Sequence, residues 1–241
     1  LTLCLPLFPH ASRWAAPVVI VLAVVSILYG ALLAIGQQDM YRLVAYTSVS
    51  HFGFIVLGIF AFTSTSISGS SFYMVNHGFS TGALFLLVGF LGARRGSVRI
   101  DAFGGLQRAV PVLAGLFLVV GLSSLALPGL SPFVSEFLVL VGTFATQPAA
   151  AVLATLGVVL AAIYILWMYQ RAFHGPVNVA VAGLPDVSAR ERWVVGPLVA
   201  LMLVLGFVPA PALNLVRPAA QVTITQVGVT DAPAVAEGSA K

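Results

Sequence analysis

The chain has 241 residues, of which 60% are hydrophobic and only 7% charged, and its mean hydropathy is +1.06. A soluble domain carries about 25% charged residues, so the soluble globular, disordered and nucleic-acid-binding classes are excluded and a polytopic membrane protein is predicted. The net charge of +4 comes almost entirely from arginine, which bears on membrane topology. The single cysteine, Cys4, excludes a disulfide framework and a thiolate metal cluster.

The first residues contain no initiator methionine and no basic segment followed by a cleavable apolar core. We therefore expect no signal peptide and interpret the chain as a piece of a longer protein. Residues 1–13 are expected to lie outside the membrane, on the extracytoplasmic side.

Runs without charge predict the membrane spans, because a helix needs about 20 apolar residues to cross the bilayer. The fourth run is longer than one straight span, and Pro128–Gly129 is its predicted break, with Pro132 just beyond. Residues 175–192 are expected to form a cytoplasmic loop and residues 214–241 a flexible extracytoplasmic tail. In chain order the predicted spans are residues 14–35, 43–62, 71–93, 110–146, 149–170 and 193–213.

The fourth run could also be divided into two separate spans, and the distribution of arginine decides between the two divisions. With one broken span, most arginines fall on one side, as the positive-inside rule requires of the cytoplasmic side. With two spans the bias nearly vanishes. We therefore predict six spans with both chain ends outside. The cytoplasmic arginines are then Arg42, Arg94, Arg95, Arg99, Arg108, Arg171, Arg190 and Arg192, and the opposite side holds Arg13, Arg217 and Lys241.

Three ionisable residues fall inside predicted spans: His51, His77 and Glu136. Such residues are costly in a membrane and usually face the bundle interior or a water-filled path. Each histidine alone is as consistent with a hydrogen bond to a neighbouring helix as with a functional role. Glu136 favours function, with proton transfer the first hypothesis, because a packing position would be filled at lower cost by Gln or Leu and because broken helices line ion sites in transporters.

Polar side chains accompany these three residues at helical spacing and form a predicted supporting path. Residues three and four apart share one face of a helix. The depth of each residue follows from a rise of about 1.5 Å per residue. His51 lies roughly 12 Å from the cytoplasmic end of its span, and His77 and Glu136 lie roughly 9 Å and roughly 15 Å from the outer ends of theirs. The three side chains could therefore form a lateral row. The supporting residues are Thr47 and Ser48 for His51, Tyr73 and Thr81 for His77, and Ser123 and Ser124 before the break.

The sequence contains no redox or hydrolytic motif. It has no Gly-rich nucleotide fingerprint, no P-loop and no pair of histidines at metal-ligand spacing on one helix. We therefore predict no cofactor-binding or metal-ligating residues. Two histidines on separate helices leave haem or zinc as a minor alternative.

Three segments, residues 39–53, 76–85 and 125–137, resemble the signatures of the antiporter-like subunits of respiratory complex I. Glu rather than Lys at position 136 is similar to the subunit M branch and differs from its sisters, subunits L and N. The resemblance covers about residues 5–171 and, more loosely, the last span. Three departures from the family pattern are Tyr41 in place of a frequent Lys, Ser135 in place of Gly, and Pro132 in place of a flexible residue.

The resemblance implies an all-α fold made of the second of two inverted five-helix repeats plus the final helix. It implies that Glu136 is the proton carrier and that His51 and His77 are proton relays on a hydrophilic axis. The Glu–Lys pair and bridging Lys of the family proton route would belong to the first half, so this piece alone would not pump.

The resemblance also implies a place in a larger machine. The chain would be a subunit of a proton-pumping NADH:quinone oxidoreductase in the bacterial plasma membrane, with two sister antiporter-like subunits as partners. NADH, FMN, iron–sulfur clusters and quinone would bind in other subunits. The alternatives are a subunit of a multi-subunit cation/proton antiporter or a membrane-bound hydrogenase, and a purely structural membrane protein.

Overall fold

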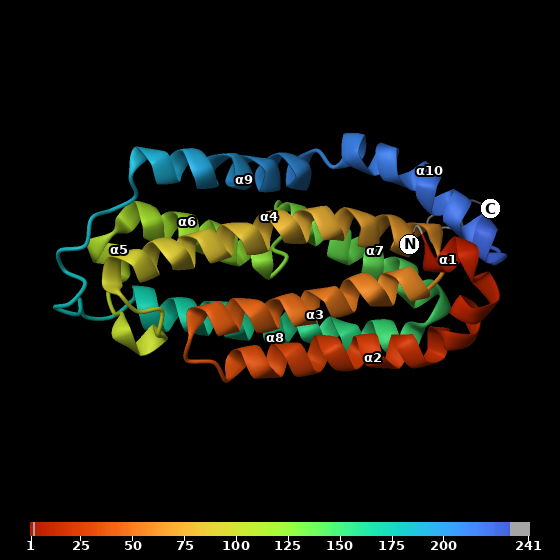
Figure 1. Ribbon diagram of the computed structural model, residues 1–241, viewed down its shortest axis with the longest axis horizontal. Helices are drawn as coiled ribbons and strands as arrows, with labels where there is room; N and C mark the ends of the chain where they lie inside the picture. The colour runs from red at the N-terminus through yellow and green to blue at the C-terminus, as the bar shows by residue number, and fades with distance from the viewer. Residues whose placement is uncertain (2, 232–241) are drawn as a thin grey trace, which may run out of the picture.

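The computed structural model describes residues 1 and 3–231, and in these residues every regular element is a helix. The long helices run side by side along the length of the molecule, and α9 and α10 follow one another along the same direction beside α4 (Figure 1). The helices are α1 Cys4–Leu7, α2 Pro9–Ile35, α3 Met40–Phe60, α4 Ser64–Arg95, η1 Ile100–Ala102, α5 Leu106–Ala109, α6 Pro111–Ser124, α7 Ser131–Thr146, α8 Pro148–Phe173, α9 Ala189–Phe207 and α10 Ala210–Val227.

Four helices, α2, α3, α4 and α8, are long and apolar enough to cross a membrane. The pair α9 and α10 passes the same test as a unit bent by 73°, and α6 and α7 are shorter apolar helices. The predicted fold class, an all-α membrane protein with one broken span, is therefore confirmed.

The broken span consists of α6 and α7, separated by residues 125–130. The segment contains two residues with left-handed backbone, Ala126 at φ 56° and Gly129 at φ 93°. The amides of Val112 and Leu113 contact the loop at one end of the bundle, whereas Thr146 donates to the Ala61 carbonyl at the other end. The two halves therefore traverse the bundle once, and the break at Pro128–Gly129 lies where the sequence predicts it.

The last predicted span and the predicted tail need correction. The span expected at 193–213 ends as a straight helix at Phe207, because Pro209 and Pro211 interrupt the backbone hydrogen bonds. The tail expected at 214–241 is helical as far as Val227. Its buried residues, Leu213, Ala220, Ile224 and Val227, recur at helical spacing, and α10 packs on α4 and α2. Residues 232–241 of that tail lie outside the described residues.

Three other boundaries also differ from the predicted ones. The first long helix starts at Pro9 rather than residue 14, since proline is well suited to a first helical turn. Helix α4 starts at Ser64 rather than residue 71, because Thr63 and Ser66 form a capping box ahead of a serine-rich first turn. Helix α9 begins at Ala189, inside the loop expected at 175–192, where Ser188 and Glu191 form a second capping box.

The arginine-rich segments meet at one end of the bundle. Backbone hydrogen bonds join Met40 to Val98 and Ile100 to Gln38, and Arg171 donates to the Gln38 side chain. At the same end Arg94 forms a bidentate ion pair with Glu191. The grouping agrees with the single broken span that the arginine distribution favours.

Candidate functional site

The candidate site lies at mid-length in the bundle, where α3, α4 and α7 pack together. Glu136 stands in the second turn of α7, directly after the break, and is 4% exposed. Tyr73 of α4 and His51 of α3 are 1% and 3% exposed. All three polar side chains are therefore withdrawn from solvent and lipid, and each must find its hydrogen-bond partners inside the protein.

These three side chains form one continuous hydrogen-bonded chain. The Tyr73 hydroxyl donates to Glu136 Oε2 at 2.5 Å and shares a 2.7 Å hydrogen bond with His51 Nδ1. When the tyrosine proton points at the carboxylate, its oxygen accepts from His51, so Nδ1 carries the ring proton and Nε2 is the basic nitrogen. His51 Nε2 is buried and has no hydrogen-bond partner among residues 1 and 3–231.

His77 stands next to this chain on the same face of α4 as Tyr73. Its ring centroid lies 5.3 Å from that of His51, and no direct hydrogen bond joins the two rings. Ser48 Oγ lies 2.8 Å from His77 Nε2, and Thr81 Oγ1 lies 3.2 Å from His77 Nδ1. The structure thus brings Glu136, His51 and His77 together, with Tyr73 as the bridge.

Other predicted site residues take different places. The Thr47 hydroxyl is buried but donates to the Val44 carbonyl of its own helix at 2.8 Å. Ser123 and Ser124 are buried at the end of α6, and neither hydroxyl has a partner within the described part of the chain. Pro128 and Gly129 form the break itself, and Pro132 stands in the first turn of α7.

With this geometry established, comparison with known proteins identifies the family. A family model described as "NADH:quinone oxidoreductase/Mrp antiporter, TM" matches residues 1–163. The chain belongs to this family.

Several curated members of this family are similar to the chain in sequence. NADH-quinone oxidoreductase subunit M of Mycobacterium tuberculosis is 51% identical over 234 residues, which are 97% of this chain and 42% of that protein. The subunit M of Rhodobacter capsulatus is 40% identical over 215 residues, covering 89% of this chain and 42% of the relative. The chain therefore spans less than half the length of these relatives.

Solved structures show the same fold. A chain of respiratory complex I from Thermus thermophilus with bound NADH superposes with a TM-score of 0.88 at 34% identity, covering 94% of this chain and 48% of that one. A chain of the Mrp complex from Dietzia superposes with a TM-score of 0.77 at 24% identity, covering 90% of this chain and 50% of that one. As a member of this family, the chain is an integral membrane protein.

The break is also held by Asn76, which the sequence did not lead us to expect as a site residue. The Asn76 side chain donates to the Ser131 carbonyl at 3.0 Å and to Ser135 Oγ at 3.3 Å. It thereby ties the first turn of α7 to α4, and Glu136 follows in the next turn of the same helix. The signal was available, because Asn76 follows Tyr73 by three residues and so shares its helix face.

A second buried tyrosine, Tyr164 of α8, was also not singled out. It is 1% exposed, and its hydroxyl has no hydrogen-bond partner among the described residues. A tyrosine in a span often lies at the membrane interface, so its burial follows only from the packing of α8.

A pocket of about 290 Å³ lies beside the break. Apart from Glu136, its walls are apolar, and they include Pro128, Phe133 and Phe137. Glu136 therefore stands between a polar chain on the α4 side and an apolar pocket on the side of the break. No group of three or more potential metal ligands occurs among residues 1 and 3–231.

Proposed function

We propose that this chain is the second-repeat part of a membrane-arm subunit of a proton-pumping NADH:quinone oxidoreductase and that it carries protons through Glu136. The observation that supports this most directly is the buried chain Glu136–Tyr73–His51, which begins on a broken helix. The naming of the 51% identical relative as an NADH-quinone oxidoreductase subunit favours the same function.

The hydrogen-bonded chain supports proton transfer because its protons can be placed in two ways, and in each of them both hydrogen bonds are formed. In the first, His51 Nδ1–H donates to Tyr73, whose O–H donates to the Glu136 carboxylate. A proton that arrives at His51 Nε2 allows Nδ1 to release its proton to the tyrosine oxygen as the tyrosine proton moves to Glu136. The result is a neutral Glu136 carboxyl and a neutral His51 protonated on Nε2, so one proton has crossed the chain without a separated charge remaining.

His77 extends the path on the side away from Glu136. No hydrogen bond joins the His51 and His77 rings, whose centroids lie 5.3 Å apart, so transfer between them would use a bridging water or a rotation of one ring. Ser48 and Thr81 hold His77 through both ring nitrogens. This arrangement supports His77 as the relay that delivers protons to His51.

The surroundings of the path follow from the same proposal. The end of the bundle that holds Arg94, Arg99 and Arg171 would face the cytoplasm of a bacterial cell, and Arg13 and Arg217 would face outward. Sister antiporter-like subunits would be its neighbours in the membrane. NADH oxidation and quinone reduction would occur on cofactors of other subunits, and this chain would convert the released energy into proton transfer.

A second candidate function is that of a subunit in a multi-subunit cation/proton antiporter. The matching family model includes Mrp antiporters, and the Dietzia Mrp complex has the same fold. Membrane vesicles separate the two functions. Acidification that requires NADH and stops with quinone reduction supports the oxidoreductase, whereas proton movement driven by a sodium gradient without NADH supports the antiporter.

The test of the proposal is Glu136→Gln in the full-length subunit, assembled in its complex, in inverted membrane vesicles. Glutamine preserves the volume and one acceptor oxygen for Tyr73 but cannot take up a proton. We expect assembly to be normal and NADH-driven internal acidification to fall by about tenfold or more, since a positioned proton-transfer group typically contributes about a hundredfold or more to the rate. Unchanged acidification together with unchanged quinone reduction would remove Glu136 from the path.

A further inference from the structure

Helix α9 packs on α4 and α7 with most of its side chains exposed, and its last turn reaches the break. Only Val195 and Met202 of this helix are buried. At its last turn, however, Gly206 approaches the break so closely that a Cβ there would lie 2.3 Å from the Gly129 carbonyl oxygen. The Phe207 ring lies over Gly129, 3.4 Å from the position of a Cβ on that glycine. The backbone of the break is therefore in direct contact with the end of α9.

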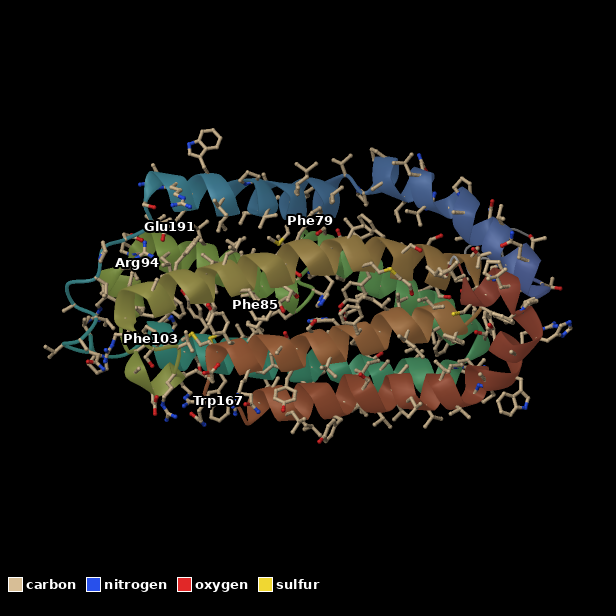
Figure 2. The ribbon with its side chains drawn as sticks, in the orientation of Figure 1. Phe79, Phe85, Arg94, Phe103, Trp167 and Glu191 are labelled. Carbon is tan, nitrogen blue, oxygen red and sulfur yellow. The ribbon has the colours of Figure 1, made fainter. Side chains whose placement is uncertain are left out.

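The other end of α9 is fixed to the start of the same broken span. Arg94 pairs with both oxygens of Glu191, in the first turn of α9, at 2.7 and 2.5 Å, and Figure 2 shows these two side chains facing each other beside α9. Arg94 also donates to the carbonyls of Pro185 and Asp186. The Asp186 carboxylate accepts from the first free amides of α6, at 2.9 and 3.0 Å.

From these contacts we infer that α9 is a brace that sets the position of the break, and that Gly206 is a positioning residue for Glu136. The inference rests on the proposed function of Glu136. One end of α9 is tied to the N-terminus of α6, and the other end presses on Gly129, so the length of α9 spans the first half of the broken helix. A displacement of α9 against the break would move the segment from which α7 and its Glu136 start.

Gly206→Ala tests the brace, and Gly196→Ala is its matched control. Both glycines lie in α9, but a Cβ at Gly196 would meet nothing within 4 Å. At Gly206 the added methyl must displace the backbone of residues 129 and 130, since contacts below 3 Å cannot be accommodated. The first readout is hydrogen–deuterium exchange of the peptide covering residues 123–131 in the full-length subunit within its complex. The second is the ratio of internal acidification to quinone reduction in inverted vesicles.

For Gly206→Ala we expect exchange in residues 126–130 to be roughly tenfold faster, because local opening becomes easier. We also expect the ratio of acidification to quinone reduction to fall about threefold or more, since small displacements of reacting groups are costly. Gly196→Ala should leave both values at wild-type level. A general loss of structure would lower acidification and quinone reduction together, so a fall in their ratio distinguishes positioning from damage.

Wild-type exchange in Gly206→Ala would overturn the brace. Faster exchange with an unchanged ratio, where Glu136→Gln does lower the ratio, would overturn the assignment of Gly206 as a positioning residue for Glu136. Phe207→Ala is measured in parallel, because it removes the ring over Gly129 without adding bulk and still reports on the contact if Gly206→Ala fails to assemble. Glu136→Gln is measured in the same vesicles. If that variant retains the wild-type ratio, the proposed function fails, whereas the exchange data still decide whether α9 holds the break.

Discussion

At the scale of single residues, the hydrogen-bonded polar side chains around the site are of two kinds according to their partners. Tyr73, Ser48 and Asn76 bond to groups on other helices, whereas the Thr47 hydroxyl bonds within its own helix. The sequence placed Thr47 and Ser48 together as supporting residues of His51. The structure separates them, because Ser48 reaches His77 on α4 and Thr47 does not leave the backbone of α3.

This difference predicts different results for two small substitutions. Ser48→Ala removes a 2.8 Å hydrogen bond to His77 and should lower coupled acidification roughly fivefold, as expected for the loss of about 1 kcal/mol. Thr47→Val keeps the shape of the side chain and loses only an intrahelical bond, so acidification should stay at wild-type level. The measurement is NADH-driven acidification in inverted vesicles. Equal effects of the two substitutions would contradict the assignment of Ser48 to the path.

At the scale of elements, the sequence predicted the break well and the end of the chain poorly. Pro128 and Gly129 predict the break, because proline and glycine change the local backbone independently of the surrounding residues. Helix α10 was missed because it is held by packing on α4 and α2, and its polar residues conceal the spacing of Leu213, Ala220 and Ile224. The role of Tyr73 as a bridge was missed for the same reason, since the contact depends on how α4 meets α3 and α7.

Asp186 gives a prediction for the start of α6, whose own N-cap residue, Val110, provides no side-chain cap. Burial alone would raise the pKa of Asp186, but hydrogen bonds from the amides of Val112, Val187 and Leu113 lower it below its ordinary value. The ionised carboxylate thus acts as an N-cap supplied by another segment. Asp186→Ala should destabilise the protein by about 1 kcal/mol, which is the usual effect of losing a cap.

The sign of the pH dependence follows from the lowered pKa. A carboxyl group whose pKa is depressed by folding contributes its stability above the unfolded value, near 3.8, and loses it as the pH falls through the folded value. The difference in melting temperature between wild type and Asp186→Ala should therefore be largest at neutral pH. It should disappear at a pH below the pKa that Asp186 has in the folded protein. Asp101→Ala is the control, because its carboxylate is exposed and, within the described part of the chain, pairs with Arg99 on the surface. A difference that widened in acid would refute the capping role.

At the scale of the whole molecule, the two ends of the bundle differ in charge, and each end carries an exposed tryptophan. Trp14, 85% exposed, stands near the start of α2, and Trp193, 81% exposed, stands in the first turns of α9. Exposed tryptophans at both ends of a helix bundle are typical of the two membrane interfaces. Together with the grouping of arginines, they favour a bundle that crosses the membrane along its long axis.

The orientation can be tested with Cys4, which is the only cysteine of this chain and is exposed. If the end of the bundle with Arg13 faces outward, a membrane-impermeant maleimide should label Cys4 in intact spheroplasts, as read from the labelled peptide by mass spectrometry. A cysteine introduced at the exposed Arg190 should be labelled only in inverted vesicles. The reverse pattern would overturn the predicted sidedness.

The central claim, that protons pass along Glu136–Tyr73–His51, is tested most directly by comparing two tyrosines. Both Tyr73 and Tyr164 are 1% exposed, but only Tyr73 joins Glu136 to His51, whereas the Tyr164 hydroxyl has no partner among the described residues. Tyr73→Phe and Tyr164→Phe each remove one buried hydroxyl from the full-length subunit in its complex. The measurement is the ratio of acidification to quinone reduction in inverted vesicles. The account predicts that the ratio falls about tenfold or more in Tyr73→Phe and stays at wild-type level in Tyr164→Phe. A wild-type ratio in Tyr73→Phe, or an equal fall in both variants, would contradict it.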